Sequence, residues 1–347
     1  MNHTITVRPS GRTYTVEDGE RILTAAIRQG IGLPYSCRDG TCGTCKVKKI
    51  SGAVTHVPHQ EKALSKEEEA EDWILTCSSF ADTDVVLESN QVTEQGAIPI
   101  RKMPARVAAL NRLADDVMQV KLQLPTSEQV LYHPGQYMEV ILRDGAHRDY
   151  SVACAPHMVR DSGSPMIELH IRHTPGGQFT DHVFAAMKEK EILRLEGPYG
   201  SSYLRDESAK PIVLLASGTG FAPIKAIIEH LQFMQNPRPA VLYWGGRRPQ
   251  DLYMDGWVRQ RLSEMPQLRY VPVVSDALPE DAWQGRSGFV HLAVLQDFPD
   301  LSGHQVYACG APIVVDSAHK DFVERAGLPA DEFFADAFTT EADKVHA

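Results

Sequence analysis

Four of the six cysteines lie near the start of the chain, with a spacing that could hold a metal cluster. They are Cys37, Cys42, Cys45 and Cys77, in the pattern C-x4-C-x2-C followed, after 31 intervening residues, by C. This is the spacing at which four thiolates bind a plant-type [2Fe–2S] cluster. Gly40 and Gly43 suit such a loop, because glycine tolerates positive φ and lets the backbone approach closely. The sequence therefore predicts a [2Fe–2S] cluster held by these four residues.

Other uses of these thiols stay open at this point. Structural zinc favours two paired C-x2-C knuckles, and only Cys42 and Cys45 are paired in that way. Disulfides are rare in the cytosol, and a thioredoxin-type C-x2-C would need neither Cys37 nor Cys77. Four unrelated core thiols would not produce this spacing.

A second motif comes after an apolar stretch with the composition of a buried strand and opens a helical stretch. It spans residues 217–223 (SGTGFAP) and is not the G-x-G-x-x-G fingerprint of dinucleotide-binding folds. Its mechanics are the same, because glycine backbone and a helix N-terminus can both face a pyrophosphate. The candidate binding residues are Gly218, Thr219, Gly220 and Pro223.

Together with the remainder of the chain, the segment LPYSCRDGTCGTCK (residues 33–46) resembles an N-terminal ferredoxin fused to a ferredoxin-NADP-reductase-like flavin and nicotinamide module. The resemblance covers almost the whole chain. The proteins it is similar to are reductase components of bacterial ring-hydroxylating oxygenases, and proteins named CDP-6-deoxy-glucoseen reductase, which serve a deoxysugar dehydratase. The resemblance implies FAD and NADH as further cofactors, with NADPH left open.

The resemblance also implies where the flavin binds. Residues 148–151 (RDYS) match the R-x-Y-S element that holds the flavin in the family. Arg148 would offer a forked donor to the pyrophosphate. The ring of Tyr150 would pack on the isoalloxazine, and the hydroxyl of Ser151 would hydrogen-bond the N5 atom that accepts hydride.

Residues 175–180 (PGGQFT) resemble the second flavin loop of the family. There, Gly176 and Gly177 would let backbone amides approach phosphate, and Thr180 would open a helix. Cys154 departs from the family pattern, which commonly has Asn near this position. We interpret it as a small core thiol.

Roles near the C-terminus are likewise implied by the resemblance. Residues 309–312 (CGAP) match a C-G-x-P motif whose cysteine lies close to the nicotinamide carbon that gives up hydride. Ser151 and Cys309 are therefore the candidate catalytic residues. Phe338 would lie against the flavin, where nicotinamide must displace it. Core packing is the alternative for both Cys309 and Phe338. Arg247 and Arg248 would lie near the adenosine ribose, or be solvated.

Three groups of elements would position these residues. An alternating hairpin, a helix ending before Gly30 and two short strands predict an α+β unit; these elements are residues 4–8 with 13–17, 20–29, 46–50 and 84–87. The resemblance makes it a β-grasp ferredoxin domain at residues 1–92. Ser65 and Glu68 predict a capping box at the start of a short acidic helix.

The rest of the chain predicts a linker and two further domains. Residues 93–103, with Gly96 and Pro99, lack periodicity and are interpreted as the linker. Short alternating runs punctuated by Pro and Gly predict an antiparallel β-barrel at residues 104–207, which the resemblance makes the flavin domain. Buried strands alternating with helices predict an α/β domain with a parallel sheet at residues 208–347, which the resemblance makes the nicotinamide domain. These strands are residues 212–216, 241–244, 270–274 and 306–309, and the helices include 221–234 and 312–326.

Composition excludes several classes of protein. The chain has 347 residues and a formal net charge of -10, with no Lys/Arg-rich run, so we expect no nucleic-acid partner. The N-terminus lacks the apolar stretch of a signal peptide, and the most apolar run, residues 211–228, is interrupted by glycine, proline and lysine. We therefore expect no membrane partner and a soluble, cytoplasmic protein that is a monomer by itself.

Several polar residues receive a structural interpretation. The fourteen histidines show no metal-site spacing. His170 and His173 are assigned to barrel packing or the surface, with a backbone or phosphate contact near the flavin loop as the alternative. The acidic run at residues 67–72 is interpreted as a solvated helix face, with a basic partner as the alternative.

The combined interpretation is an NAD(P)H-dependent electron-transfer reductase. Hydride passes from NAD(P)H to FAD, and single electrons then pass through the [2Fe–2S] cluster to a partner protein. The preferred partner is an aromatic-ring oxygenase or demethylase component, and the alternative is a CDP-deoxysugar 3-dehydratase. A hypothesis of another class is a flavin reductase whose N-terminal unit is a zinc-bound or metal-free interaction module.

Overall fold

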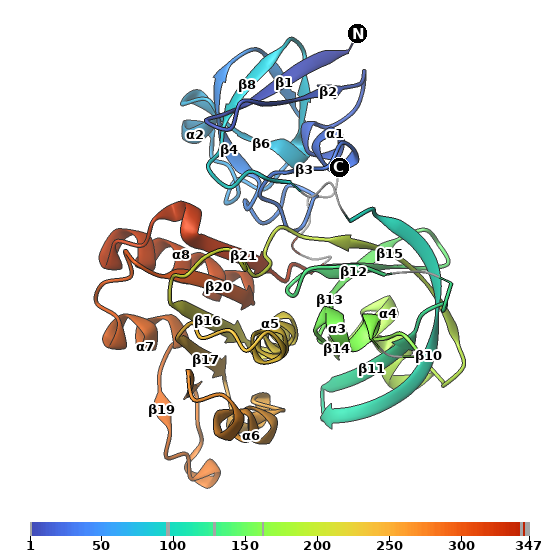
Figure 1. The fold of residues 1–347 in the computed structure, drawn as a ribbon, viewed down its shortest axis with the longest axis vertical. Coiled ribbons are helices and arrows are strands. Elements are labelled where there is room, and N and C mark those ends of the chain that lie inside the picture. The colour runs from blue at the N-terminus through green and yellow to red at the C-terminus, as the bar shows by residue number, and fades with distance from the viewer. Residues whose placement is uncertain (1, 95–97, 128–129, 162, 341–342, 344–347) are drawn as a thin grey trace. The chain divides into compact units, whose positions relative to one another are not determined.

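The structure of the protein is a computed structural model, which describes residues 2–94, 98–127, 130–161, 163–340 and 343 (Figure 1). The chain forms two compact units. Unit 1 comprises Met1–Pro99, Gly200–Ser202 and Ala335–Ala347, and unit 2 comprises Ile100–Tyr199 and Tyr203–Phe334. Within the described ranges, no helix has both the length and the apolar composition that a bilayer crossing requires.

Unit 1 is built on a five-stranded mixed sheet in the order β2-β1-β8-β4-β6. The strands are β1 (His3–Arg8), β2 (Arg12–Val16), β4 (Lys46–Ser51), β6 (Trp73–Leu75) and β8 (Val85–Glu88). Strand β1 pairs antiparallel with β2 and parallel with β8. The alternation expected for the hairpin is present, because Ile5, Val7, Tyr14 and Val16 are buried. Helix α1 (Ile22–Arg28) contributes an apolar face to the same core, and Gly30, at φ 71°, follows its end.

Smaller elements complete unit 1. Strand β3 (Ile31–Gly32) pairs with β9 (Thr93–Glu94), and β5 (Val54–His56) pairs with β7 (Ser79–Ala81). Helix α2 (Lys66–Ala70) begins at the predicted capping box, in which Ser65 and Glu68 exchange hydrogen bonds. A 3₁₀ turn, η1 (Thr76–Ser78), carries Cys77.

The region expected to be a linker, residues 93–103, differs in part from that expectation. It contains β9, and strand β10 (Arg101–Ala114) already begins within it. Residues 95–97, which include Gly96, lie outside the described residues. The alternation of buried Met103, Ala105 and Val107 is masked in the sequence by basic residues and by Pro104. The residue limits of the three domains stay a prediction.

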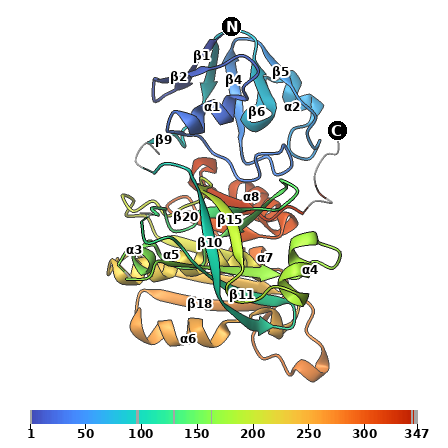
Figure 2. The same cartoon turned by 90° about the vertical axis from the view of Figure 1, so that its right-hand side faces the viewer.

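The first half of unit 2 is a six-stranded antiparallel sheet in the order β13-β12-β15-β10-β11-β14. The strands besides β10 are β11 (Val117–Gln123), β12 (Tyr137–Ile141), β13 (His147–Ser151), β14 (Met166–Arg172) and β15 (Ile192–Tyr199), with helices α3 (Pro156–Arg160) and α4 (Gln178–Ala185). Figure 2 shows the long β10 beside β15. A bridge between Val152 and Leu169 joins the two ends of the sheet, which closes it in the manner of a barrel. Its interior is apolar and includes Val120, Val140, Leu169 and Leu195.

The second half of unit 2 is a six-stranded sheet in the order β19-β18-β17-β16-β20-β21, with parallel pairing from β19 to β20. Its strands are β16 (Ile212–Ser217), β17 (Ala240–Gly246), β18 (Leu268–Val274), β19 (Arg286–Ser287), β20 (Gln305–Gly310) and β21 (Phe333–Ala337). The last three residues of β21 belong to unit 1. Its helices are α5 (Phe221–Phe233), α6 (Asp255–Glu264), α7 (Val290–Asp297) and α8 (Pro312–Ala326), and its 3₁₀ turns are η2 (Gly218–Gly220), η3 (Pro249–Asp251), η4 (Pro279–Asp281) and η5 (Ala330–Glu332). The predicted fold class is confirmed in all three parts.

Candidate functional site

The four predicted cluster cysteines converge in unit 1. Three lie on the loop before β4 and the fourth on η1, and all four are free thiols. The thiols of Cys37 and Cys42 lie close enough to shift each other's pKa, and so do those of Cys45 and Cys77. The interaction with Cys37, helped by the hydroxyl of Thr44, lowers the pKa of Cys42 to about 7.

Backbone features of the loop also fit a cluster. The amide of Cys42 donates to the sulfur of Cys37 at 3.4 Å, the kind of contact that stabilises negative charge on sulfur. Gly40 has a φ of 81°, and a Cβ there would lie 2.7 Å from Ser78 Oγ and 2.9 Å from His59 Cβ. The loop therefore needs glycine at this position. Four converging sulfurs with a backbone donor form a suitable ligand set for a [2Fe–2S] cluster.

Two short chain segments pack with this loop inside unit 1. Ser36, next to Cys37, donates to Asp336 of β21 at 2.6 Å. Ser201 Oγ accepts from the amide of Tyr35 at 2.8 Å and donates to its carbonyl at 2.9 Å. Segments more than 160 residues away in the sequence thus help to fix the entry to the cysteine loop. Phe338 follows β21 directly and is half-buried.

The first predicted flavin motif lies on β13, at one end of the barrel sheet. Arg148 and Tyr150 lie on one face of the strand, and Ser151, which is buried, lies on the other. The Tyr150 ring packs against Phe179 with centroids 5.5 Å apart, and burial raises the pKa of its hydroxyl. Arg148 donates to the carbonyl of His147 at 2.8 Å. The strand therefore presents an aromatic ring and a guanidinium at successive positions of one face.

The second predicted flavin loop lies between β14 and α4 and is held by its own residues. Thr180 Oγ1 donates to the carbonyl of Thr174 at 2.8 Å and accepts from its amide at 3.2 Å. The amides of Gly176 and Gly177 also donate within the loop, to Asp181 and to Thr174. Here the glycines serve the tight turn, with Gly176 at φ 82°, rather than presenting free amides. Tyr150 and this loop meet through Phe179 of α4.

The two predicted nicotinamide motifs meet at the carboxyl ends of neighbouring parallel strands. Strand β16 is followed by η2 and α5, and β20 is followed by α8. The strand order reverses at β16, which has β17 on one side and β20 on the other. In open α/β sheets, ligands bind in the crevice at such a switch point. The fold thus places residues 217–223 and 309–312 where a nucleotide is expected.

Two glycines allow these loops to pass each other. A Cβ on Gly220 would lie 2.0 Å from the carbonyl oxygen of Cys309, and a Cβ on Gly310 would lie 2.4 Å from that of Ser217. Both obstacles are backbone atoms, so no side-chain rotation could relieve them. Cys309 itself is 1 % exposed at the end of β20. Thr219 is half-buried between the two glycines of its loop, and Pro223 lies in the first turn of α5.

Arg172 is a candidate binding residue that no sequence motif identifies. It ends β14, and its Nη1 would lie 2.9 Å from a Cβ on Gly218, so the guanidinium covers the glycine loop. It forms ion pairs with Asp116 at 3.1 Å and with Asp251 at 3.7 Å. Among the described residues, its Nε and Nη2 are buried without a hydrogen bond of good geometry. No local pattern signals this role, because only the fold brings residues 172 and 218 together.

Arg247 and Arg248, which the resemblance would place near the adenosine ribose, follow β17. Both lie 3.7 Å from Asp276, and Arg248 also lies 3.7 Å from Asp281. The Arg247 side chain is 82 % exposed. Both arginines therefore form ion pairs with acidic neighbours, and these pairs reduce the positive charge available to a 2′-phosphate.

A buried polar network links the barrel to α5 within unit 2. Lys225 donates to the carbonyl of Ala153 at 2.8 Å and to Glu229 at 2.7 Å, and lies 3.4 Å from Glu168. The second oxygen of Glu229 accepts from the amide of Ala155 at 2.9 Å. Residues 153–155 follow the first flavin motif after a single intervening residue, Val152. The network therefore fixes the end of that motif to the helix that begins at the nicotinamide loop.

His170 extends this network. Its Nε2 lies 2.7 Å from Glu168, and its Nδ1 lies 2.9 Å from the hydroxyl of Tyr253. Because a carboxylate only accepts, His170 donates to Glu168 and accepts from Tyr253. Burial lowers the pKa of His170 and keeps its ring neutral. Burial alone would raise the pKa of Glu168, but the His170 hydrogen bond and the charge of Lys225 lower it to about 2.

Replacing Lys225 with methionine is expected to destabilise unit 2 by about 3–5 kcal/mol, because two largely buried carboxylates, 12% and 13% exposed, lose their cation. The pKa of Glu168 lies below its ordinary value of 4.5, so its carboxylate stabilises the fold fully above that pH and progressively less as the pH falls toward 2. Loss of the cation raises this pKa. Acid release of FAD, followed by flavin fluorescence, should therefore occur at a higher pH in the variant.

Lys102→Met is the matched control for this titration. Lys102 lies 3.4 Å from Glu196 on the same barrel, but its side chain is 64 % exposed. Exposed ion pairs contribute little, so its acid transition should match that of the parent protein. Equal transitions for the Lys225 and Lys102 variants would contradict the role given to the buried network.

Cys154 fits its structural interpretation. It is 5 % exposed and belongs to the barrel core, and burial raises the pKa of its thiol to about 11. The hydroxyl of Tyr132 donates to its carbonyl oxygen at 2.8 Å. The Cys154 thiol is therefore an inert part of the core.

Comparison with known families matches each of the three parts of the fold to a cofactor-binding domain family. Residues 5–82 match the family described as 2Fe-2S iron-sulfur cluster binding domain, residues 104–203 the oxidoreductase FAD-binding domain, and residues 214–320 the oxidoreductase NAD-binding domain. The chain is thus built for a [2Fe–2S] cluster, FAD and a nicotinamide nucleotide, which are the predicted cofactors.

Several characterised proteins are similar along nearly the whole chain. CDP-6-deoxy-L-threo-D-glycero-4-hexulose-3-dehydrase reductase of Yersinia pestis is 38% identical, over 97% of this chain and 99% of that protein. The terephthalate 1,2-dioxygenase reductase component 1 of Comamonas sp. is 33% identical over 100% of both chains. Among solved structures, the Amycolatopsis cytochrome P450 reductase GcoB is 32% identical, with a TM-score of 0.77 over 97% of this chain and 99% of that chain.

Proposed function

The chain belongs to the iron–sulfur flavoprotein reductases, in which a [2Fe–2S] domain is joined to FAD- and NAD-binding oxidoreductase domains, and on that premise we propose the residues that bind its cofactors and the acceptor it serves. When bound, these groups turn the two-electron hydride of NAD(P)H into single electrons for a partner protein. We further propose that one chain acts as a monomer, because it carries all three modules.

The cysteine loop carries this proposal. Convergence of Cys37, Cys42, Cys45 and Cys77 supports their role as the cluster ligands. A zinc-bound or metal-free N-terminal module is disfavoured by the matched 2Fe-2S family. Iron and sulfide analysis of the purified protein, with its visible spectrum, tests this assignment directly. A yellow protein without iron would overturn it.

The flavin is proposed to lie against β13 and the loop before α4. Arg148 would contact its pyrophosphate, Tyr150 would pack on its ring system, and Ser151 would hydrogen-bond N5. Gly176, Gly177 and Thr180 shape the loop beside it. Phe338 is half-buried after β21, and its role against the flavin, which the resemblance implies, stays a prediction.

The nicotinamide nucleotide is proposed to bind at the switch point between β16 and β20. Gly218, Thr219, Gly220 and Pro223 would face its pyrophosphate at the start of α5. Cys309 would border the nicotinamide ring. NADH is proposed as the donor, because the arginines near the expected ribose are already paired with acidic residues.

Replacing Arg172 with glutamine is expected to weaken NADH binding by about 10- to 100-fold, because one charge-assisted contact to the pyrophosphate is lost. The turnover number at saturating NADH should change much less, since the ring-binding residues are untouched. Arg160→Gln is the control, because Arg160 is 60 % exposed and pairs with the adjacent Asp161. Equal Michaelis constants for parent, R172Q and R160Q proteins would contradict the role of Arg172.

The preferred acceptor is an oxygenase component. Similarity over the full domain order to reductases of terephthalate dioxygenase and of a cytochrome P450 supports this choice. The second candidate is a CDP-deoxysugar 3-dehydratase, favoured by the 38% identity to the Yersinia pestis reductase.

Offering the two acceptors in parallel separates these candidates. The chain and NADH are mixed anaerobically with the oxygenase component of Comamonas terephthalate dioxygenase or with the Yersinia dehydrase, and the reduction of each acceptor is timed. We expect transfer to the oxygenase to be faster by at least about tenfold, as interface complementarity governs such encounters. The reverse order would favour the dehydratase.

A further inference from the structure

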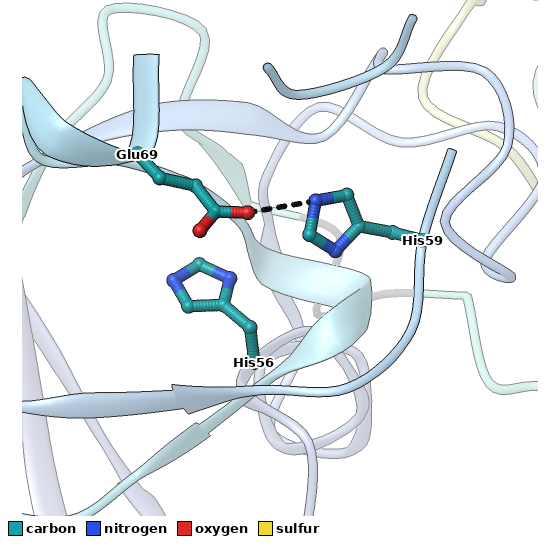
Figure 3. A group of neighbouring side chains, drawn as sticks. All are labelled: His56, His59 and Glu69. Atoms are coloured by element: carbon teal, nitrogen blue, oxygen red, sulfur yellow. Dashed lines mark ion pairs between the residues drawn. The ribbon is translucent and has the colours of Figure 1, made fainter. Parts of the chain in front are cut away.

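A second group of metal-ligating side chains lies in unit 1, apart from the four cysteines. His56 ends β5, His59 lies three residues further along, and Glu69 comes from α2 (Figure 3). One potential ligand atom from each residue lies within 4.8 Å of those of the other two. The spacing of the two histidines does not by itself predict a metal site, because the third ligand, the Glu69 carboxylate, comes from a separate helix.

The hydrogen bonds of His59 define which of its nitrogens is free to coordinate. Nδ1 lies 3.1 Å from the carbonyl oxygen of Val57, which can only accept, so Nδ1 carries a hydrogen. Its Nε2 lies 2.9 Å from Glu69 Oε1, where a proton on this nitrogen completes the ion pair drawn in Figure 3 and a metal ion would take the place of that proton.

His56 is arranged in the same way. Its Nδ1 lies 3.4 Å from Ser79 Oγ, and Ser79 uses its hydrogen to bond the carbonyl of Leu75 at 2.8 Å. The oxygen of Ser79 is therefore left to accept from His56, which leaves Nε2 of His56 with a lone pair. A backbone or hydroxyl partner on the second nitrogen is the usual support of a metal-bound histidine.

We propose that His56, His59 and Glu69 bind a divalent zinc-type ion, with water at the open position. Two imidazoles and one carboxylate form a ligand set that zinc accepts, whereas magnesium and calcium prefer oxygen ligands alone. Zinc–nitrogen and zinc–oxygen bonds are about 2.0–2.2 Å long, so neighbouring ligand atoms of a tetrahedral ion lie about 3.3–3.6 Å apart. The 2.9 Å spacing of His59 and Glu69 would widen slightly on binding, and any longer spacing, of at most 4.8 Å, would shorten. Lys49, whose charge acts on His56, is neutralised by Asp72 at 2.6 Å.

The position of this site indicates what the ion would do. The amide of Gln60 donates to the carbonyl of Gly40 at 3.0 Å, and the amide of Val57 donates to that of Ser78 at 2.9 Å. The segment that carries both histidines therefore supports both parts of the cysteine site. A zinc ion that ties this segment to α2 would stiffen the support of the cluster loop without touching a cysteine.

The test uses the full holoprotein with its cluster and FAD. After EDTA treatment and desalting, the protein is dialysed against Zn²⁺, and zinc and iron are measured in the same sample. We expect one zinc per chain with no loss of iron, and binding at least about tenfold weaker in H56Q, H59Q and E69Q. His182→Gln is the control, because His182 pairs with Glu191 at 2.7 Å on the barrel, outside this group.

X-ray absorption at the zinc edge of the parent protein decides the case even if a variant loses its cluster. Nitrogen and oxygen neighbours with imidazole scattering would support the proposal. Sulfur neighbours, or iron lost in proportion to the zinc gained, would place the ion in the cysteine site and overturn it. Absence of bound zinc, or equal affinity in H59Q and H182Q, would overturn it as well.

Discussion

Replacing Cys77 with alanine is expected to lower NADH-driven reduction of cytochrome c by at least about a hundredfold, while reduction of ferricyanide persists. Cys77 is 2 % exposed and lies on η1, so alanine would remove one of the four proposed ligands. Cytochrome c is a protein that takes one electron at a time, and it should draw on the cluster. Ferricyanide is small and should still collect electrons from the flavin.

Cys154→Ala is the matched control for Cys77→Ala. Both residues are buried thiols, and Cys154 lies in the barrel core instead of the cysteine loop. Its replacement should cost a little stability, about 1 kcal/mol for a small cavity, and leave both reductions intact. If cytochrome c reduction survived in Cys77→Ala at the level of the control, electrons would not need the cluster.

Replacing Gly220 with alanine is expected to be the most damaging single change in the nicotinamide domain. The new Cβ would lie 2.0 Å from the carbonyl oxygen of Cys309, so the loops after β16 and β20 would have to separate. Reduction by NADH should fall by about a hundredfold or more, since misplacement by about 1 Å is already costly. Reduction of the flavin and the cluster by dithionite should be unaffected, which distinguishes a lost donor site from lost cofactors.

Gly303→Ala provides the control in the same domain. A Cβ on Gly303 meets nothing within 4 Å, so the substitution should leave the NADH reaction unchanged. If Gly220→Ala were reduced by NADH as fast as Gly303→Ala, the switch-point crevice would not be the donor site.

Much of the fold could be predicted because its elements carry local signals. The first hairpin alternates apolar and polar residues, and the start of α2 has its capping box. The helices after Gly220 and Ala311 begin where a glycine loop and a proline predict them. The start of β10 could not be predicted, because Pro104 and its basic neighbours hide the buried positions.

Sites assembled from distant residues left no comparable signal. Arg172 covers the glycine loop although it lies 46 positions before Gly218 in the sequence. The network of Glu168, His170 and Lys225 likewise joins β14 to α5. His56 and His59 meet a carboxylate from the acidic run whose pattern indicates only a solvated face. Periodicity reports which side of an element is buried, and it does not report what lies against that side.

An anaerobic titration with NADH, followed by optical and electron paramagnetic resonance spectra, tests the electron path most directly. We predict that a rhombic signal from the reduced [2Fe–2S] centre appears as the flavin absorption bleaches. Bleaching of the flavin with no cluster signal, in protein that holds iron and sulfide, would contradict this path, because electrons would then stop at FAD.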